Sequence, residues 1–260
     1  MRILIGIVFL LITTSSFAST FEGKFIQGSF ILGKTDPGSE VFIDKKQVKV
    51  TSDGFFAFGL ERDRKNDVVI TINKKKIVKK VYKRKYNIQR IDGLEEKKVT
   101  PPEEVYVRIK KENKLIGDAK AIDSNLTYFK NKFIVPIENT IISGVYGSQR
   151  ILNGKPKWPH YGLDFAADEG TTIKAMLDGI VTLAEPDLYY TGGTLMFDHG
   201  HGISTIYLHM QKLLVKKGQK IKQGDVIGTV GSTGRATGAH LDVRLNWFQT
   251  RLDPMTALNH

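Results

Sequence analysis

The sequence lacks cysteine altogether, and its 27 acidic residues are outnumbered by 39 basic ones. Without cysteine there is no disulfide framework and no lipid-bearing cysteine, so stability must come from hydrophobic cores and metal. Long apolar runs are also missing. The unbroken run at residues 3–12 is too short for a membrane span, which needs about 20 apolar residues. The composition is otherwise that of a globular chain rather than a disordered or fibrous one.

Residues 1–18 have the organisation of a signal peptide. Arg2 precedes the apolar run, and the small-residue sequence Ser16-Phe17-Ala18 follows it, which predicts cleavage after Ala18. An uncleaved membrane anchor is the alternative, and the shortness of the run disfavours it. We therefore expect a mature protein without a stable membrane anchor, located in the periplasm, with extracellular release as the alternative.

The charge of the chain indicates an anionic partner. The formal net charge is +12 and the pI is near 9.6. For an exported protein, a cell wall or a membrane surface is the expected partner of such a charge. The sequence contains no nucleic-acid-binding motif, so we expect no nucleic acid among its partners.

Turn residues and short apolar stretches predict a mainly β protein. Glycine occurs 25 times, and the apolar stretches are rich in Val, Ile, Phe and Tyr. A chain of this length favours two modest domains. We expect a small antiparallel β-sandwich at residues 19–90, with turns at Asp36-Pro37-Gly38 and Ser52-Asp53-Gly54, and a second all-β domain at residues 130–260.

Residues 91–129 are predicted to form a linker with a helix. Thr100 fits a helix cap, Pro101 and Pro102 fit a helix start, and Glu103 and Glu104 fit a first turn. We expect the helix to end near residue 121. The linker and the first domain would position or restrain the second domain.

Three segments of the second domain carry histidine and acidic side chains. His160 and Asp164 would share one face of an extended strand, as would His240 and Asp242, and His209 ends a third expected strand. Imidazole nitrogen and carboxylate oxygen are common metal ligands. A single pair of this kind, however, is more often ordinary polar surface.

In this order the three segments resemble the lysostaphin-type (LytM-like) zinc endopeptidases, whose signature is an H-x-x-x-D pair, a single His and an H-x-H pair. The resemblance spans residues 141–254 and extends to Gly147-Ser148-Gln149-Arg150, Asp198-His199-Gly200 and Ser232-Thr233-Gly234. It implies a C-terminal lysostaphin-type peptidase domain of β-sheet and barrel-sandwich structure that binds one Zn²⁺. By this resemblance His160 and Asp164 would be zinc ligands.

The resemblance also implies a catalytic role for two further histidines. His209 and His240 would be a pair outside the ligand set that moves protons and stabilises the oxyanion. Zinc would activate the attacking water.

The sequence departs from the family pattern at Asp242, where the second His of the H-x-H pair usually provides the third ligand. If Asp242 binds the metal, the site is His-Asp-Asp. Two carboxylates would weaken zinc as a Lewis acid and make a harder divalent metal the alternative. In the other interpretation, Asp242 pairs with Arg244 and the metal site is incomplete.

The function implied by the resemblance is an exported zinc metalloendopeptidase that hydrolyses the peptide cross-links of peptidoglycan. Arg150 and Tyr207 are further candidates for substrate binding, although Arg150 could instead tie down the loop after Gly147. The alternative is a catalytically impaired wall-binding protein that regulates other cell-wall hydrolases as its partners. A barrel-sandwich carrier module, suggested by the turns and strands of residues 215–228, gives no reason for the histidines.

Overall fold

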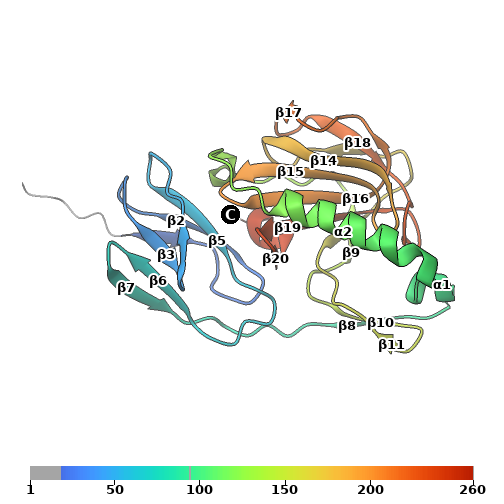
Figure 1. The fold of residues 1–260 in the computed structure, drawn as a ribbon, viewed down its shortest axis with the longest axis horizontal. Coiled ribbons are helices and arrows are strands. Elements are labelled where there is room, and N and C mark those ends of the chain that lie inside the picture. The colour runs from blue at the N-terminus through green and yellow to red at the C-terminus, as the bar shows by residue number, and fades with distance from the viewer. Residues whose placement is uncertain (1–18, 94, 260) are drawn as a thin grey trace, which may run out of the picture.

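The computed structural model describes residues 19–93 and 95–259 (Figure 1). The predicted signal peptide at residues 1–18 lies outside these described residues. Within them, no helix is both long and apolar enough to cross a membrane. Strands are the main secondary structure, which confirms the prediction of a mainly β protein.

The N-terminal domain packs two small antiparallel sheets into the predicted β-sandwich, drawn in blue and cyan in Figure 1. Side chains alternate between the core and the surface along β6, as expected when one face of a sheet is buried. Phe56 and Phe58 of one sheet are fully buried with Val41 and Ile70 of the other. The sheets have the strand orders β1-β2-β5 and β4-β3-β6-β7, with the bounds β1 (Thr20–Glu22), β2 (Phe30–Lys34), β3 (Val41–Ile43), β4 (Lys46–Val48), β5 (Phe55–Gly59), β6 (Val68–Ile72) and β7 (Lys75–Lys79).

The linker contains the predicted helix. After β8 (Ile88–Ile91) come α1 (Glu96–Val99), the 3-10 turn η1 (Glu103–Val105), α2 (Tyr106–Lys120) and the 3-10 turn η2 (Tyr128–Lys130). The helix begins later than predicted because Pro102 remains extended, with φ −59° and ψ 152°. Glu103 and Glu104 consequently form η1 rather than the first turn of α2.

The C-terminal domain is built on one large antiparallel sheet with the strand order β17-β14-β15-β16-β19-β12-β9. β13 pairs with β18, β20 pairs with β19, and β10 lies between β8 and β11. The bounds are β9 (Ile141–Gly144), β10 (Gln149–Leu152), β11 (Lys155–Pro156), β12 (Leu163–Ala166), β13 (Thr172–Lys174), β14 (Gly179–Leu188), β15 (Gly192–Gly200), β16 (Ile203–Leu213), β17 (Lys220–Ile221), β18 (Val226–Val230), β19 (His240–Trp247) and β20 (Thr250–Leu252), followed by α3 (Pro254–Leu258).

Helix α2 crosses the large sheet in front of β15 and β16 (Figure 1). It packs a short apolar stripe on side chains from three strands, in a cluster made of Ile116, Ala119, Leu183, Leu188, Met196, Ile206 and Leu208. Near the start of the helix, Arg108 binds the Asp187 carboxylate at 3.0 Å, and near its end the Gly117 carbonyl accepts a hydrogen bond from Gln249 at 2.9 Å. The helix therefore covers this part of the sheet face.

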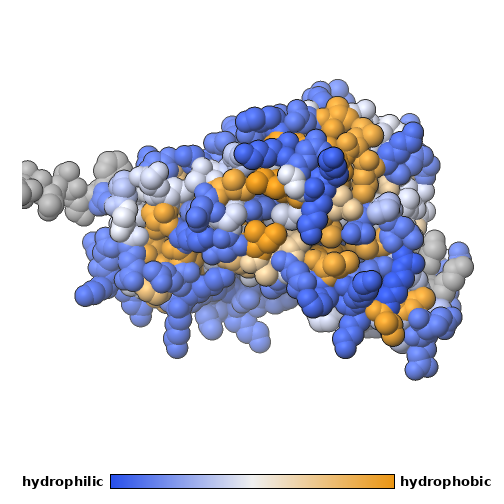
Figure 2. Space-filling view, turned by 45° about the horizontal axis from the view of Figure 1, so that its top comes forward, coloured by the Kyte–Doolittle hydropathy of each residue, from blue (hydrophilic) through white to orange (hydrophobic). Residues whose placement is uncertain are grey.

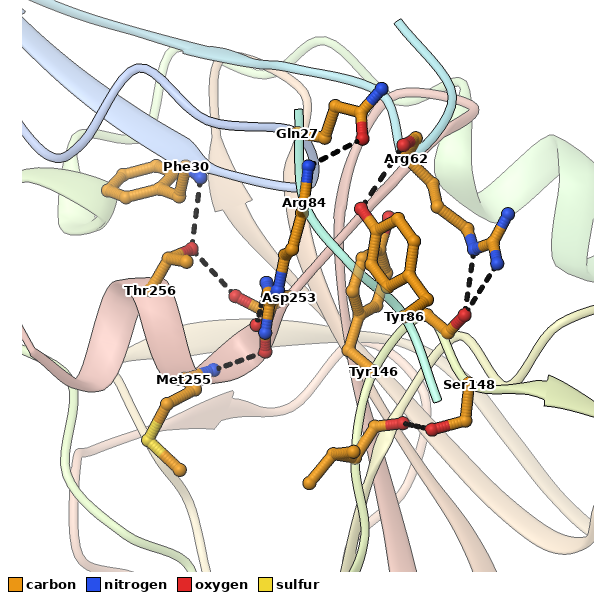
Figure 3. A network of polar contacts seen from close by, with 12 residues as sticks. Gln27, Phe30, Arg62, Arg84, Tyr86, Tyr146, Ser148, Asp253, Met255 and Thr256 are labelled. Carbon is orange, nitrogen blue, oxygen red and sulfur yellow. Dashed lines mark hydrogen bonds and ion pairs between the residues drawn. The ribbon is translucent and has the colours of Figure 1, made fainter. Parts of the chain in front are cut away.

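The two domains meet at α3 (Figure 3). Arg84 Nη1 of the first domain lies 2.6 Å from Asp253 Oδ2, and the Phe30 N–H donates to Thr256 Oγ1 at 3.0 Å. Asp253 also caps α3, because its Oδ1 accepts the N–H of Met255 at 3.0 Å. One buried carboxylate thus stabilises the last helix and binds the first domain to it.

A second contact joins the first domain to the loop after β9. The Arg62 Nε and Nη2 atoms donate to the Gly147 carbonyl at 2.9 and 2.6 Å. The Tyr86 ring stacks on the Arg62 guanidinium at 4.3 Å, and its hydroxyl donates to the Arg62 carbonyl (Figure 3). Gly147 has φ +86°, and a Cβ there would collide with the Tyr86 ring, so the contact requires glycine.

Replacing Asp253 by Ala removes both the cap of α3 and the partner of Arg84. We expect the free energy of unfolding, measured by urea titration, to fall by about 3 kcal/mol, since a lost cap costs about 1 kcal/mol and a lost hydrogen bond between charged groups costs about 2 kcal/mol. Asp168→Ala removes an exposed carboxylate and should change stability by less than about 0.5 kcal/mol. Equal effects of the two substitutions would contradict this account of the interface.

Candidate metal centre

His160 is held in the loop between β11 and β12 by two backbone hydrogen bonds. Its N–H donates to the Ser148 carbonyl at 2.8 Å, and its carbonyl accepts the N–H of Gly147 at 2.7 Å. The residue is 1% exposed, and neither ring nitrogen has a hydrogen-bond partner among the described residues. A buried imidazole without partners is unfavourable, and a bound metal ion would satisfy it.

Asp164 of β12 and Asp242 of β19 are directly opposite each other in the antiparallel register. Their side chains therefore project from the same face of the sheet. His160 Nε2 lies 3.1 Å from Asp164 Oδ1 without hydrogen-bond geometry. Ligand atoms of the three residues all lie within 4.8 Å of one another. The structure thus brings together the three residues predicted as ligands.

The backbone around His160 differs from the prediction. The sequence pattern predicts His160 and Asp164 on one face of a single strand, but β12 begins at Leu163 and His160 lies in the preceding loop. The hydrogen bonds to Gly147 and Ser148 hold this loop instead of a strand ladder. The side chains of His160 and Asp164 still converge, with ligand atoms within 4.8 Å of each other.

Two glycines leave room for the carboxylates. A Cβ at Gly162 would collide with Asp242 Oδ1, and one at Gly144 would collide with Asp164 Oδ2. Both carboxylates are also buried. One imidazole and two carboxylates confined in this way suit zinc, and they also suit a harder divalent cation. The residues of the centre therefore fit a metal ion.

Asp242 also forms the predicted ion pair with Arg244. Arg244 Nη2 lies 2.8 Å from Asp242 Oδ2, and Nε lies 3.3 Å from both carboxylate oxygens. Burial alone would raise the pKa of Asp242, but Arg244 and His160 outweigh it and hold that pKa below its usual range. The ion pair and the grouping with His160 coexist, so pairing with Arg244 does not remove Asp242 from the site.

His209 and His240 form a second pair of imidazoles, with ring centroids 4.8 Å apart. The Nδ1 atom of His209 lies 2.8 Å from the Thr233 carbonyl, and that of His240 lies 2.8 Å from the Gly238 carbonyl. A carbonyl can only accept, so Nδ1 carries a proton in both rings, and in the neutral form of an imidazole with this tautomer Nε2 is the acceptor. Burial lowers the pKa of His209 to about 4, which keeps it neutral near pH 7.

The backbone bends at His209. This residue has φ +64°, a conformation that few non-glycine residues adopt, and the pairing of β16 with β18 shifts register just beyond it. The bend interrupts the alternation of side chains along β16, so His209 turns toward His240. Such strained residues are concentrated at functional sites.

A cavity of about 340 Å³ lies beside these groups. Its lining includes Asp164, His209 and His240, together with the guanidinium side chains of Arg150 and Arg235. Arg150 was predicted as a substrate-binding residue, and the structure places it at the cavity. Arg235 was not singled out, although it lies in the glycine-rich segment that precedes His240.

The structure does not support the predicted role of Tyr207 in substrate binding. Tyr207 is 1% exposed, its ring packs against Phe197 at 5.3 Å, and its hydroxyl accepts the N–H of Met176 at 2.9 Å. Residue 207 pairs with Val243, whereas residue 208 pairs with Asp242. Because side chains alternate along a strand, Tyr207 points into the core, away from the candidate centre.

Gln89 of β8 also lines the cavity and was missed. It comes from the end of the first domain, and its Oε1 accepts a hydrogen bond from Arg150 Nε at 3.2 Å. No local signal in the sequence could identify it, because its position depends on the parallel pairing of β8 with β10.

Substituting Gly162 by Ala tests the geometry of the centre. We expect the added Cβ to displace the Asp242 carboxylate and to weaken zinc binding, measured by competition with a chromophoric chelator, by about 10- to 100-fold. Gly117→Ala is the control, because a Cβ at Gly117 in α2 would meet nothing within 4 Å. Unchanged zinc affinity in the Gly162 variant would mean that Asp242 is not a ligand.

Comparison with known proteins identifies relatives of the C-terminal domain. Residues 158–254 match the model of peptidase family M23. Peptidoglycan DD-endopeptidase ShyA of Vibrio cholerae is 45% identical over 87 residues, which are 34% of this chain and 20% of ShyA. DD-carboxypeptidase/endopeptidase Mpg of Neisseria meningitidis is 38% identical over 118 residues, 44% of this chain and 26% of Mpg. The chain thus spans about a quarter or less of the length of these two relatives.

One solved structure is similar over nearly the whole chain. It is a Pseudomonas aeruginosa protein described as an M23 peptidase, with a TM-score of 0.69 and 25% identity over 90% of this chain and 95% of that one. Its fold therefore includes counterparts of both domains.

Proposed function

We propose that the protein is a zinc metalloendopeptidase that hydrolyses peptide cross-links of peptidoglycan, with residues 158–254, which match the model of peptidase family M23, as the core of its catalytic domain. One observation carries the proposal: the buried His160 imidazole has no hydrogen-bond partner in the described part of the chain and lies beside two buried carboxylates. The names of ShyA and Mpg support the proposed substrate.

Each side chain of the centre has a separate part in this reaction. His160, Asp164 and Asp242 would hold the zinc ion, which when bound supplies Lewis-acid polarisation of an amide carbonyl and activation of water. His209 is neutral, and its Nε2 is available to accept a proton because Nδ1 faces the Thr233 carbonyl. His240, paired with it, would return the proton to the leaving amine or donate to the developing oxyanion.

Arg244 and Arg150 affect how well a metal ion held by one histidine and two aspartates could activate water. Two carboxylates would neutralise the charge of a divalent metal ion. Arg244 donates a 2.8 Å hydrogen bond to the Asp242 carboxylate, and Arg150 Nη2 lies 3.7 Å from Asp164 Oδ2. These guanidinium groups offset part of the carboxylate charge, so the centre would retain a positive potential toward an amide carbonyl.

We further propose that the protein is exported and acts in the periplasm. The signal-peptide pattern of residues 1–18 supports export, and the net charge of +12 suits a wall that carries free carboxylates. Peptidoglycan peptides would then be the principal partner.

A second candidate function is regulation of other cell-wall hydrolases without catalysis. The observation that favours it is the ion pair between Asp242 and Arg244, which compensates the buried Asp242 carboxylate without a metal. A wall-binding regulator would need this compensation, whereas an enzyme must also hold the metal.

Release of cleaved muropeptides from purified peptidoglycan tests the proposal. We expect the mature protein to cleave, chelation to abolish cleavage and zinc to restore it. His160→Ala and Asp242→Ala should lose both zinc and activity. His240→Ala should keep zinc and lose activity by about 10²- to 10⁴-fold, the usual contribution of a general acid or base.

Asp168→Ala, which removes an exposed carboxylate outside the centre, is the matched control and should behave as the unaltered protein. Metal-free protein that binds peptidoglycan and cuts nothing would contradict the enzyme and support the regulator. Cleavage that persists in His160→Ala would place the chemistry elsewhere.

A further inference from the structure

Residues 74–85 concentrate positive charge in the N-terminal domain. This segment has no acidic residue and eight basic ones, namely Lys74, Lys75, Lys76, Lys79, Lys80, Lys83, Arg84 and Lys85. Arg84 is bound to Asp253. None of the seven lysines forms an ion pair with another described residue, and all of them except Lys79 are exposed. The charge of this basic segment is therefore available to a partner outside the chain.

Lysine and apolar side chains alternate on the outer face of β7. Ile77 packs against the hydrophobic core, and side chains alternate along a strand, so Lys76 and Val78 project outward. Val78 is 56% exposed. Lys80 and Tyr82 follow at the same spacing just beyond the strand, and Tyr82 is 58% exposed. The outer face thus presents apolar side chains between ammonium groups.

Apolar side chains continue this face onto the neighbouring strands. Val69 of β6 is opposite Val78, and Thr71 of β6 lies between Phe42 of β3 and Lys76. Directly opposite residues project from the same face of a sheet. Val69 and Phe42 are half-buried, so part of each remains at the surface. The sheet therefore has an apolar area beside its row of lysines.

Protection of a strand edge explains only part of the basic segment. Lysine on an edge strand prevents pairing with another chain, and β7 is the edge of its sheet. Lys83 and Lys85, however, lie beyond β7. Val78 and Tyr82 expose apolar surface that such protection does not require. The combination of charge and apolar area indicates a binding surface.

We propose that the outer face of β7, with the segment that follows it, binds the surface of a bilayer that contains anionic phospholipid. Lysines attract the phosphates of such a surface. Valine and tyrosine side chains are favoured at the boundary between headgroups and acyl chains. A wall polymer that offers only carboxylates would leave Val78 and Tyr82 without a role. The contact is peripheral and reversible, because few apolar side chains take part in it.

The basic segment lies away from the candidate metal centre. Figure 1 shows β7 at the end of the molecule opposite β9 and β10, and Figure 2 shows hydrophilic side chains along the lower edge of the N-terminal domain. A molecule bound to a membrane through this face would leave the cavity beside the metal centre outside the contact. The inference is independent of the proposed function, because the contact requires neither metal nor catalysis.

Co-sedimentation of the mature protein with lipid vesicles tests the inference. We expect binding to vesicles of equal parts phosphatidylglycerol and phosphatidylcholine, weakened by salt, and none to phosphatidylcholine alone. The combined variant Lys76→Gln, Lys80→Gln and Lys83→Gln should lose affinity on the order of 100-fold, since each lysine near an anionic surface contributes about fivefold. Tyr82→Ser should also weaken binding, although it leaves the charge unchanged. Both variants should keep the urea midpoint of the unaltered protein.

A second triple variant, Lys216→Gln, Lys217→Gln and Lys220→Gln, is the matched control. These lysines are exposed on the C-terminal domain, so their substitution changes the net charge equally and should leave vesicle binding nearly unchanged. Equal losses in the two triple variants, or equal binding to both kinds of vesicle, would overturn the inference. Unchanged binding by Tyr82→Ser, or loss of peptidoglycan binding alone in the first triple variant, would overturn the assignment to a membrane. Vesicle binding by a protein that cleaves no muropeptide would retain this inference and contradict only the proposed activity.

Discussion

The antiparallel register of β12 against β19 is the constraint on which the candidate centre depends. It sets Asp164 opposite Asp242, so both carboxylates project from one face at the same level of the sheet. A shift of one residue would turn one of them into the core. Leu163 and Phe165, paired with Val243 and Leu241 and buried beneath, oppose such a shift because it would expose them. The hydrophobic core thus fixes the spacing of the two acids.

The first domain contributes to the same centre from a distance. Arg62 holds the carbonyl of Gly147, and the N–H of Gly147 holds the carbonyl of His160. The backbone of Gly147 therefore connects the sandwich to His160, and the stacked Tyr86 keeps Arg62 in place. Gln89, in the strand that leaves this domain, adds a contact to Arg150. The N-terminal domain therefore supports the geometry of the centre, beyond joining it through the linker.

Much of the fold and of the site could be predicted from local patterns. Alternation along residues 240–245 correctly placed His240 and Asp242 on one face, and the turn signals correctly indicated a sandwich. Predictions failed where tertiary contacts override local pattern. His160 lies in a loop because backbone bonds to Gly147 and Ser148 replace a strand, and Tyr207 is buried because its strand turns that position to the core. The left-handed backbone at His209 cannot be recognised from the alternation of polar and apolar residues along a strand. The sequence alone did not decide whether Asp242 binds a metal or pairs with Arg244. In the structure Asp242 forms the ion pair and is also grouped with His160 and Asp164.

The central claim is that His160, Asp164 and Asp242 bind one metal ion. Diffraction at the zinc absorption edge from crystals of the zinc-soaked protein tests it most directly. We predict one anomalous peak within about 2.0–2.2 Å of a His160 ring nitrogen and of one oxygen from each carboxylate. No peak at this position, or a peak bound by His209 and His240 instead, would contradict the account.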